Sequence, residues 1–189
     1  MRYLCYDSAL NEVYTLLLLQ KEFPHHINLF AGTKDESIWH VAPWLFQVND
    51  ENIYEKWEDP NCHLERCIII ETPISLHELK EHLQQFLYKK VNNKTVYNRY
   101  WDAKVLKTQL EKMTSVALSD FFEAIKDLFI QQDNGFIKIT VDAKNRLKVE
   151  PISTSKLFSN NQRTNSESTI PTIQEIDEKP KPKRRFFTD

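Results

Sequence analysis

The sequence predicts an α/β or α+β fold in which helices pack on a mixed sheet. Three observations favour this class. Helix-type and strand-type patterns alternate along residues 1–150, which is the arrangement expected when helices cover a sheet. Hydrophobic residues make up 41% of the 189-residue chain, enough to bury a core. The run Ile68-Ile69-Ile70 is continuously apolar, which is typical of a central strand that is covered on both faces.

The first quarter of the chain predicts a strand, a helix and a second strand. Arg2–Tyr6 has strand character, and Ser8 can cap a helix that runs to about Gln20. The apolar residues of this helix recur with helical period, so they predict one buried face: Leu10, Val13, Tyr14, Leu17 and Leu18. Pro24 ends the helix, and Ile27–Phe30 then has strand character.

The middle of the chain alternates short elements around the predicted central strand. A short helix over 34–40, an extended segment over 44–48 and a helix over 51–57 precede a strand at Cys67–Glu71. Ser75 and Glu78 then have the spacing of a capping box, in which each side chain satisfies a free backbone amide of the other residue. They predict that a helix with an apolar stripe begins after Ser75.

The last third predicts two more helices, a hairpin and a tail. After a strand over 95–101, Asp102 is expected to cap one helix, and Ser119 another that runs to Asn134-Gly135. Residues 136–149 alternate in polarity about a turn and predict a C-terminal β-hairpin. Beyond Pro151 the chain is rich in Ser, Thr, Asn, Lys and Pro, so we expect one domain over 1–151 and a disordered tail over 152–189.

The composition excludes several classes of function. Two glycines, Gly32 and Gly135, are too few for a phosphate-binding loop, and a net charge of −2 is unlike that of a nucleic-acid-binding protein. The apolar run Leu16–Leu19 is too short to span a membrane. An odd number of cysteines, three, indicates reduced thiols. We therefore expect a cytoplasmic protein with no nucleic-acid or membrane partner.

The candidate metal ligands do not form a convincing site. His77 and His82 are five residues apart and diverge by about 140° on a helix, whereas a zincin pair needs a spacing of four. Cys62, His63 and Cys67 form a local cluster without a second adjacent ligand pair, although His25 and His26 are available elsewhere in the sequence. We predict an inert buried thiol at Cys67 and no metal, cofactor or catalytic site. A small hydrolase or metal enzyme that uses this cluster remains the enzymatic alternative.

The tryptophans are the best candidates for a protein-binding surface. Tryptophan is enriched both in protein cores and in interface hot spots. Trp39, Trp44 and Trp57 lie near the ends of predicted elements, so we expect them to contact a partner. The sequence thus favours a binding protein over an enzyme.

Two motifs resemble the Tap-type effector adaptor (chaperone) domain of bacterial type VI secretion systems. Asn28–Thr33 followed by Val41–Leu45 is similar to the family's "LF-x-GT … aPyL" signature, and Arg99–Leu106 to its "R-F-Y-D-P-R-V-L" stretch. The resemblance covers residues 3 to 131. Ala103 and Lys104 stand where the family commonly has proline and arginine, so no role of that arginine is carried over to Lys104. The motif residues expected to be structural are Phe30, Gly32, Thr33, Pro43, Arg99, Tyr100, Trp101 and Asp102.

The resemblance implies a non-enzymatic role in the bacterial cytoplasm. Members of the family bind the N-terminal region of a toxic effector and help to load it onto the VgrG spike protein. An immunity-type inhibitor, which neutralises a toxin by direct binding, has the same size, acidity and compartment and is the alternative. An adaptor is expected to hold the effector's transport region, and an inhibitor its toxin region.

Overall fold

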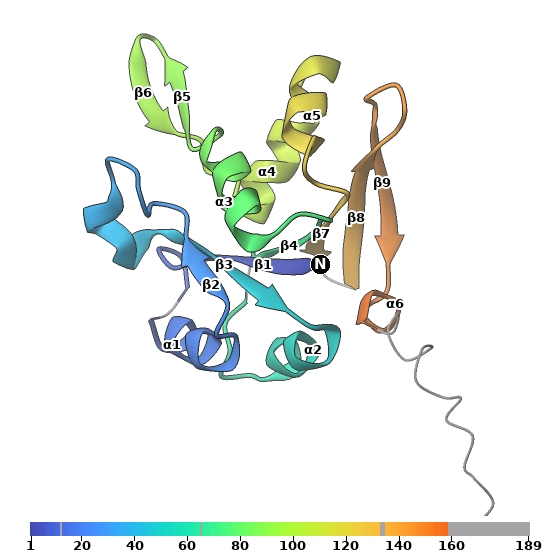
Figure 1. Cartoon of the computed structure of the whole chain (residues 1–189). Helices are drawn as coiled ribbons and strands as arrows, with labels where there is room; N and C mark the ends of the chain where they lie inside the picture. Colours follow the sequence, from blue (N-terminus) through green and yellow to red (C-terminus); the bar gives the residue numbers. More distant parts are fainter. Residues whose placement is uncertain (12, 65, 133–134, 159–189) are drawn as a thin grey trace, which may run out of the picture.

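A computed structural model describes residues 1–158 except 12, 65, 133 and 134. A seven-stranded sheet forms the middle layer, with helices on both of its faces (Figure 1). The predicted α+β class is therefore confirmed. Within the described part of the chain, no helix is both long enough and apolar enough to cross a membrane.

The elements follow one another in short segments. The strands of the large sheet are β1 (Arg2–Asp7), β2 (His26–Asn28), β3 (Pro43–Val48), β4 (Ile68–Glu71), β7 (Asp127–Gln132), β8 (Gly135–Val141) and β9 (Leu147–Ile152). A separate hairpin consists of β5 (Tyr88–Val91) and β6 (Lys94–Tyr97). The helices are α1 (Val13–Glu22), the 3₁₀ helix η1 (Glu36–Val41), α2 (Asp50–Glu58), α3 (Leu76–Gln84), α4 (Ala103–Leu110), α5 (Ser115–Phe122) and α6 (Thr154–Phe158).

The large sheet has the strand order β2-β3-β1-β4-β7-β8-β9. Each of its strand pairs is antiparallel, so the predicted mixed sheet is wrong in this respect. Helices interleaved with strands in a sequence are typical of parallel crossovers. Here the connection through α3, α4 and α5 joins the antiparallel neighbours β4 and β7. Helices α1 and α2 instead each connect two strands that run in the same direction with another strand between them.

The central strands are buried on both faces, which creates two hydrophobic cores. Tyr3 and Cys5 of β1 belong to the core beneath α3, α4 and α5, whereas Leu4 and Tyr6 belong to the core that includes residues of α1, α2 and α6. Figure 1 shows these two groups of helices on opposite sides of the sheet. The run Ile68–Ile70 divides in the same way, so the prediction of a doubly covered central strand is confirmed.

Helix α1 faces the sheet with a different side from the one predicted. Its buried residues are Thr15, Leu16 and Leu19. Of the five predicted inner residues, Leu18 is half-buried, whereas Leu10, Val13, Tyr14 and Leu17 are 42%, 65%, 58% and 59% exposed. Thr15 fixes this orientation, because its Oγ1 accepts a 3.0 Å hydrogen bond from the backbone N–H of His63. Leu16 and Leu19 then enter the second core.

The predicted helix over 119–134 is also wrong in its N-cap and in most of its length, because Ser119 lies inside α5 and the helix ends at Phe122. Thr114 caps the shorter helix α5, and the chain then forms the strand β7 beside β4. Leu128 and Ile130 enter one core and Phe129 the other, which is the alternation of a strand. The capping box of Ser75 and Glu78 and the β8–β9 hairpin are both confirmed.

The described chain extends past residue 151 into β9 and α6. Leu157 of α6 is buried in the second core, and its carbonyl accepts a 2.7 Å hydrogen bond from Arg2 of β1. These contacts attach residues 152–158 to the domain, although their composition resembles that of the tail. The rest of the predicted disordered tail, residues 159–189, lies outside the described residues.

The orientation of α1 yields a stability test. Thr15→Val keeps the shape of the side chain but leaves the His63 N–H without its acceptor, so it should lower the free energy of unfolding by about 1–3 kcal/mol. Leu17→Ala, on the exposed side, should change it by less than ~0.5 kcal/mol beyond helix propensity. Urea unfolding measures both values, and the reverse ranking would show that α1 packs as its sequence pattern predicted.

Candidate partner-binding surfaces

The second family motif forms an ion-paired junction between β1 and α4. Arg99 donates to Asp7 at the end of β1 over 2.6 Å, and Asp7 is buried. Asp102 pairs with Arg66 through both carboxylate oxygens. Asp102 also accepts hydrogen bonds from the backbone amides of Lys104 and Val105 at 3.0 and 3.4 Å. Its predicted role as the N-cap of α4 is therefore confirmed.

The aromatic residues of the motif lie inside the first core. Tyr100 donates to the carbonyl of Leu83 on α3 over 2.8 Å, and burial raises its pKa well above the ordinary value. Trp101 packs edge-on against Phe30, the aromatic residue of the first motif, with ring centres 6.3 Å apart. The two motifs therefore meet in space, although some 70 residues separate Phe30 from Trp101 in the sequence.

The other residues of the first motif shape the turn after Phe30. Gly32 has a φ of +79°, a conformation that favours glycine. Thr33 donates its hydroxyl to the Phe30 carbonyl over 2.8 Å and closes the turn. Pro43 is buried at the start of β3, opposite Asp7 of β1. These contacts give the motif residues structural roles and leave none of their side chains as a reactive group.

The three tryptophans that were expected to bind a partner differ in their exposure. Trp39 of η1 is 53% exposed, whereas Trp44 of β3 is only 7% exposed and stacks on Phe46. Trp57 of α2 is half-buried against Phe136 and Phe158. Trp44 and Trp57 thus contribute to the second core because their strand and helix face it. Of the three, Trp39 alone has the exposure expected of an interface residue.

A surface that the sequence analysis assigned to the core lies on α1. We define the α1 face as the exposed side chains of Leu10, Val13, Tyr14 and Leu17. Helical spacing places Val13, Tyr14 and Leu17 on one side of α1, and Leu10 lies in the turn before the helix. The last residue of α1 contacts α2. Glu22 accepts a 3.1 Å hydrogen bond from the Asn52 side chain, and its carboxylate lies 3.6 Å from the Lys56 ammonium. The α1 face is therefore apolar and exposed, and it lies on a helix that is attached to α2.

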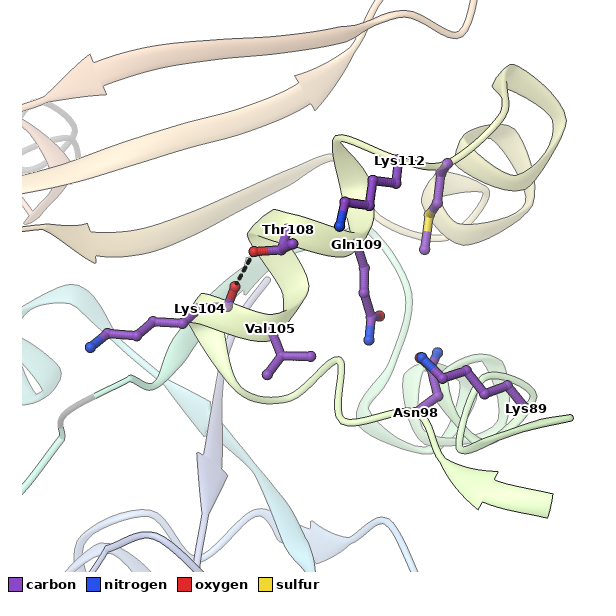
Figure 2. A pocket seen from close by; sticks show the side chains of 8 residues that line it. Lys89, Asn98, Lys104, Val105, Thr108, Gln109 and Lys112 are labelled. Carbon is purple, nitrogen blue, oxygen red and sulfur yellow. Dashed lines mark hydrogen bonds between the residues drawn. The ribbon is translucent and has the colours of Figure 1, made fainter. Parts of the chain in front are cut away.

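A second surface is a groove between α4 and the β5–β6 hairpin. We call it the α4 groove; its volume is about 680 Å³. Lys104 and Lys112 line it from the two ends of α4, and Lys89 from β5. Val105 and Met113 contribute apolar surface. Figure 2 shows the side chain of Gln109 extending from α4 toward Asn98, and the Thr108 hydroxyl bonded to the Lys104 carbonyl.

Comparison with known proteins assigns the chain to a family. Residues 3–120 match the family described as "Domain of unknown function (DUF4123)", which covers more than half of the chain. The chain belongs to the DUF4123 family. No curated protein and no solved structure gives a significant match.

Both candidate surfaces lie within the DUF4123 segment. The α1 face comes from its first helix, and the α4 groove from α4 and the hairpin before it. The strands β7, β8 and β9 follow the matched segment, yet β7 pairs with β4 and completes the same sheet. Residues beyond the family match are therefore part of the fold that carries these surfaces.

The cysteine–histidine cluster of this DUF4123 chain has the chemistry of packed thiols. Cys62 and Cys67 are buried, while His63 is exposed. Burial raises the pKa of Cys62 to about 11 and that of Cys67 well above its usual value, so both stay protonated at neutral pH. Over the ranges that the structure describes, no three or more His, Cys, Asp or Glu side chains are placed to hold a metal ion. His77 is exposed, whereas His82 is buried and bonded to the Phe121 carbonyl.

The junction between β1 and α4 predicts a large effect for Asp102. Asp102→Ala removes a helix cap and leaves the Arg66 guanidinium without its carboxylate, so it should lower the free energy of unfolding by about 3 kcal/mol. The matched control is Asp120→Ala on α5, an exposed aspartate, which should change stability by less than ~0.5 kcal/mol. Chemical unfolding of both variants checks this. Equal changes in the free energy of unfolding for the two variants would contradict a structural role for Asp102.

Proposed function

We propose that this chain is a non-enzymatic adaptor that binds a type VI secretion effector and helps to load it onto the VgrG spike. The observation that carries the proposal is the α1 face. Three apolar side chains stand exposed on one side of a helix whose other side is buried in the core, and Leu10 is exposed in the turn before it. A contiguous apolar patch on a rigid element is characteristic of a protein–protein interface.

The chemistry of the α1 face fits a protein partner better than a small ligand. Small ligands occupy concave sites that enclose most of their surface. The α1 face instead presents branched aliphatic side chains and Tyr14 from the outside of a helix. A partner helix or strand can cover such a stripe, and Tyr14 supplies both apolar area and a hydroxyl for a hydrogen bond. An effector segment docked there would shield the four side chains from water.

Three further observations support an adaptor. The chain belongs to the DUF4123 family, and its paired motifs resemble the Tap-type effector adaptors, which act in the bacterial cytoplasm. Trp39 is exposed on η1 and offers a second aromatic contact for a partner. The thiols of the cysteine cluster are buried and protonated, so they lack the thiolate that nucleophilic catalysis requires.

The first test is to purify the tagged chain from its native bacterium while the secretion system is expressed. Mass spectrometry should identify an effector and a VgrG protein among the co-purified proteins. Fragments of the effector should then localise binding to its N-terminal region. Binding confined to the C-terminal toxin region would favour the immunity-type inhibitor, and absence of both proteins would contradict the adaptor.

The role of the α1 face is tested by charge substitution. Val13→Glu combined with Leu17→Glu should weaken effector binding about thirtyfold, because carboxylates at a hot spot lose contacts and must be desolvated (~2 kcal/mol). The control is Val116→Glu combined with Val149→Glu, two exposed valines on α5 and β9. Calorimetry of purified complexes measures affinity, and circular dichroism monitors folding. Unchanged affinity in the Val13/Leu17 variant would exclude this surface.

A further inference from the structure

The α4 groove combines positive charge with apolar surface. Lys89, Lys104 and Lys112 are exposed, and within the described part of the chain none of them forms an ion pair. Among the residues that the structure describes, no carboxylate lines the groove. Lys89 and Lys112 place positive charge beside the groove, and Lys104 adds a third charge at its edge, where its side chain extends away from Gln109 (Figure 2). These lysines give the groove a positive potential, although the chain as a whole carries a net charge of −2. A ligand with acidic groups complements this site.

Gln109 adds a requirement for a hydrogen-bond donor. Its Oε1 atom is buried and has no hydrogen-bond partner among the described residues. Such an acceptor costs free energy unless a donor reaches it. Inorganic phosphate offers mainly acceptor oxygens, so it matches the lysines but not Gln109. A peptide supplies both kinds of group, since its acidic side chains pair with the lysines while a backbone N–H donates to Gln109 once this groove-lining side chain turns its Oε1 atom outward.

The apolar residues of the groove narrow the choice of ligand further. Val105 and Met113 line the groove together with the lysines and can cover an aliphatic side chain of the ligand. Nucleic acid matches the charge, but the acidic balance of the whole chain opposes a polyanion that extends beyond the groove. A peptide with acidic residues on either side of an apolar one satisfies all three features of the site.

We propose that the α4 groove binds an acidic, amphipathic peptide segment of a protein partner. The groove then recognises the segment by charge at its rim, by the Gln109 acceptor and by apolar contact with Val105 and Met113. This deepens the proposed function, on which it rests for the origin of the segment in an effector or a spike protein. The peptide chemistry itself follows from the groove and is testable without either protein.

The experiment uses the full chain and a synthetic, fluorescently labelled peptide in which Glu and Leu alternate. The control peptide has Lys in place of each Glu. Fluorescence anisotropy should detect saturable binding of the acidic peptide alone. In the ¹⁵N-labelled chain, NMR shifts should centre on Val105, Gln109 and Met113. Shifts confined to the basic run 179–185 would overturn the proposal, because they would locate binding in the tail.

Charge-matched variants separate the groove from general electrostatic attraction. Lys89→Glu combined with Lys112→Glu should weaken peptide binding at least about tenfold, since two charge-assisted contacts are lost. Lys144→Glu combined with Lys148→Glu changes the net charge equally at the distant β8–β9 hairpin and should have little effect. Equal weakening by both variants would overturn the proposal. Gln109→Met should weaken binding several-fold without the salt dependence of the lysine variant.

Competition experiments test which class of ligand the α4 groove binds. Inorganic phosphate and a single-stranded RNA oligonucleotide are added to the peptide complex at matched ionic strength. The proposal expects neither to displace the peptide at micromolar concentration. Displacement by phosphate would make the groove an anion site, and tighter binding of RNA would make it a nucleic-acid site, so either result overturns the proposal. If no effector co-purifies from the bacterium but the peptide binds as described, the proposed adaptor function is contradicted while the proposed peptide site in the α4 groove is supported.

Discussion

The burial of β1 and β4 on both faces is the constraint on which the rest of the structure depends. Their side chains alternate between two cores, so neither strand has a face that can meet water. Helices must cover both sides, although the chain has only short helices for this purpose. The acidic and basic residues at the ends of the strands then fix the helices, as Arg99 and Asp7 do at the end of β1.

This constraint explains why α1 turns its larger apolar stripe outward. The helix has apolar residues around most of its circumference, so two orientations can bury hydrophobic surface. The buried Thr15 favours one of them, because its hydroxyl oxygen accepts a hydrogen bond from the backbone N–H of His63. The inward side needs only Leu16 and Leu19 to fill the space above the sheet. The remaining apolar residues Val13, Tyr14 and Leu17 are left exposed.

The sequence predicted those features whose physical cause is local. The run Ile68–Ile70 and the caps at Ser75 and Asp102 depend on neighbouring residues, and the structure confirms them. The inner face of α1 was predicted wrongly because a periodic apolar stripe does not distinguish a core from a partner. The strand β7 was missed because Phe121, Phe122, Leu128 and Phe129 also fit helical spacing. The lysines of the α4 groove come from separate elements, and their sequence spacing carries no signal.

The two surfaces lie on elements that cover opposite faces of the sheet. The α1 face projects from the side of the second core, and the α4 groove from the side of the first. An adaptor that transfers an effector to a spike must contact both proteins during the transfer, so its contacts must not compete for one surface. An apolar face and a basic groove also select different chemistry, which reduces exchange between the two partners. The doubly covered sheet therefore supplies the separation that the proposed function requires.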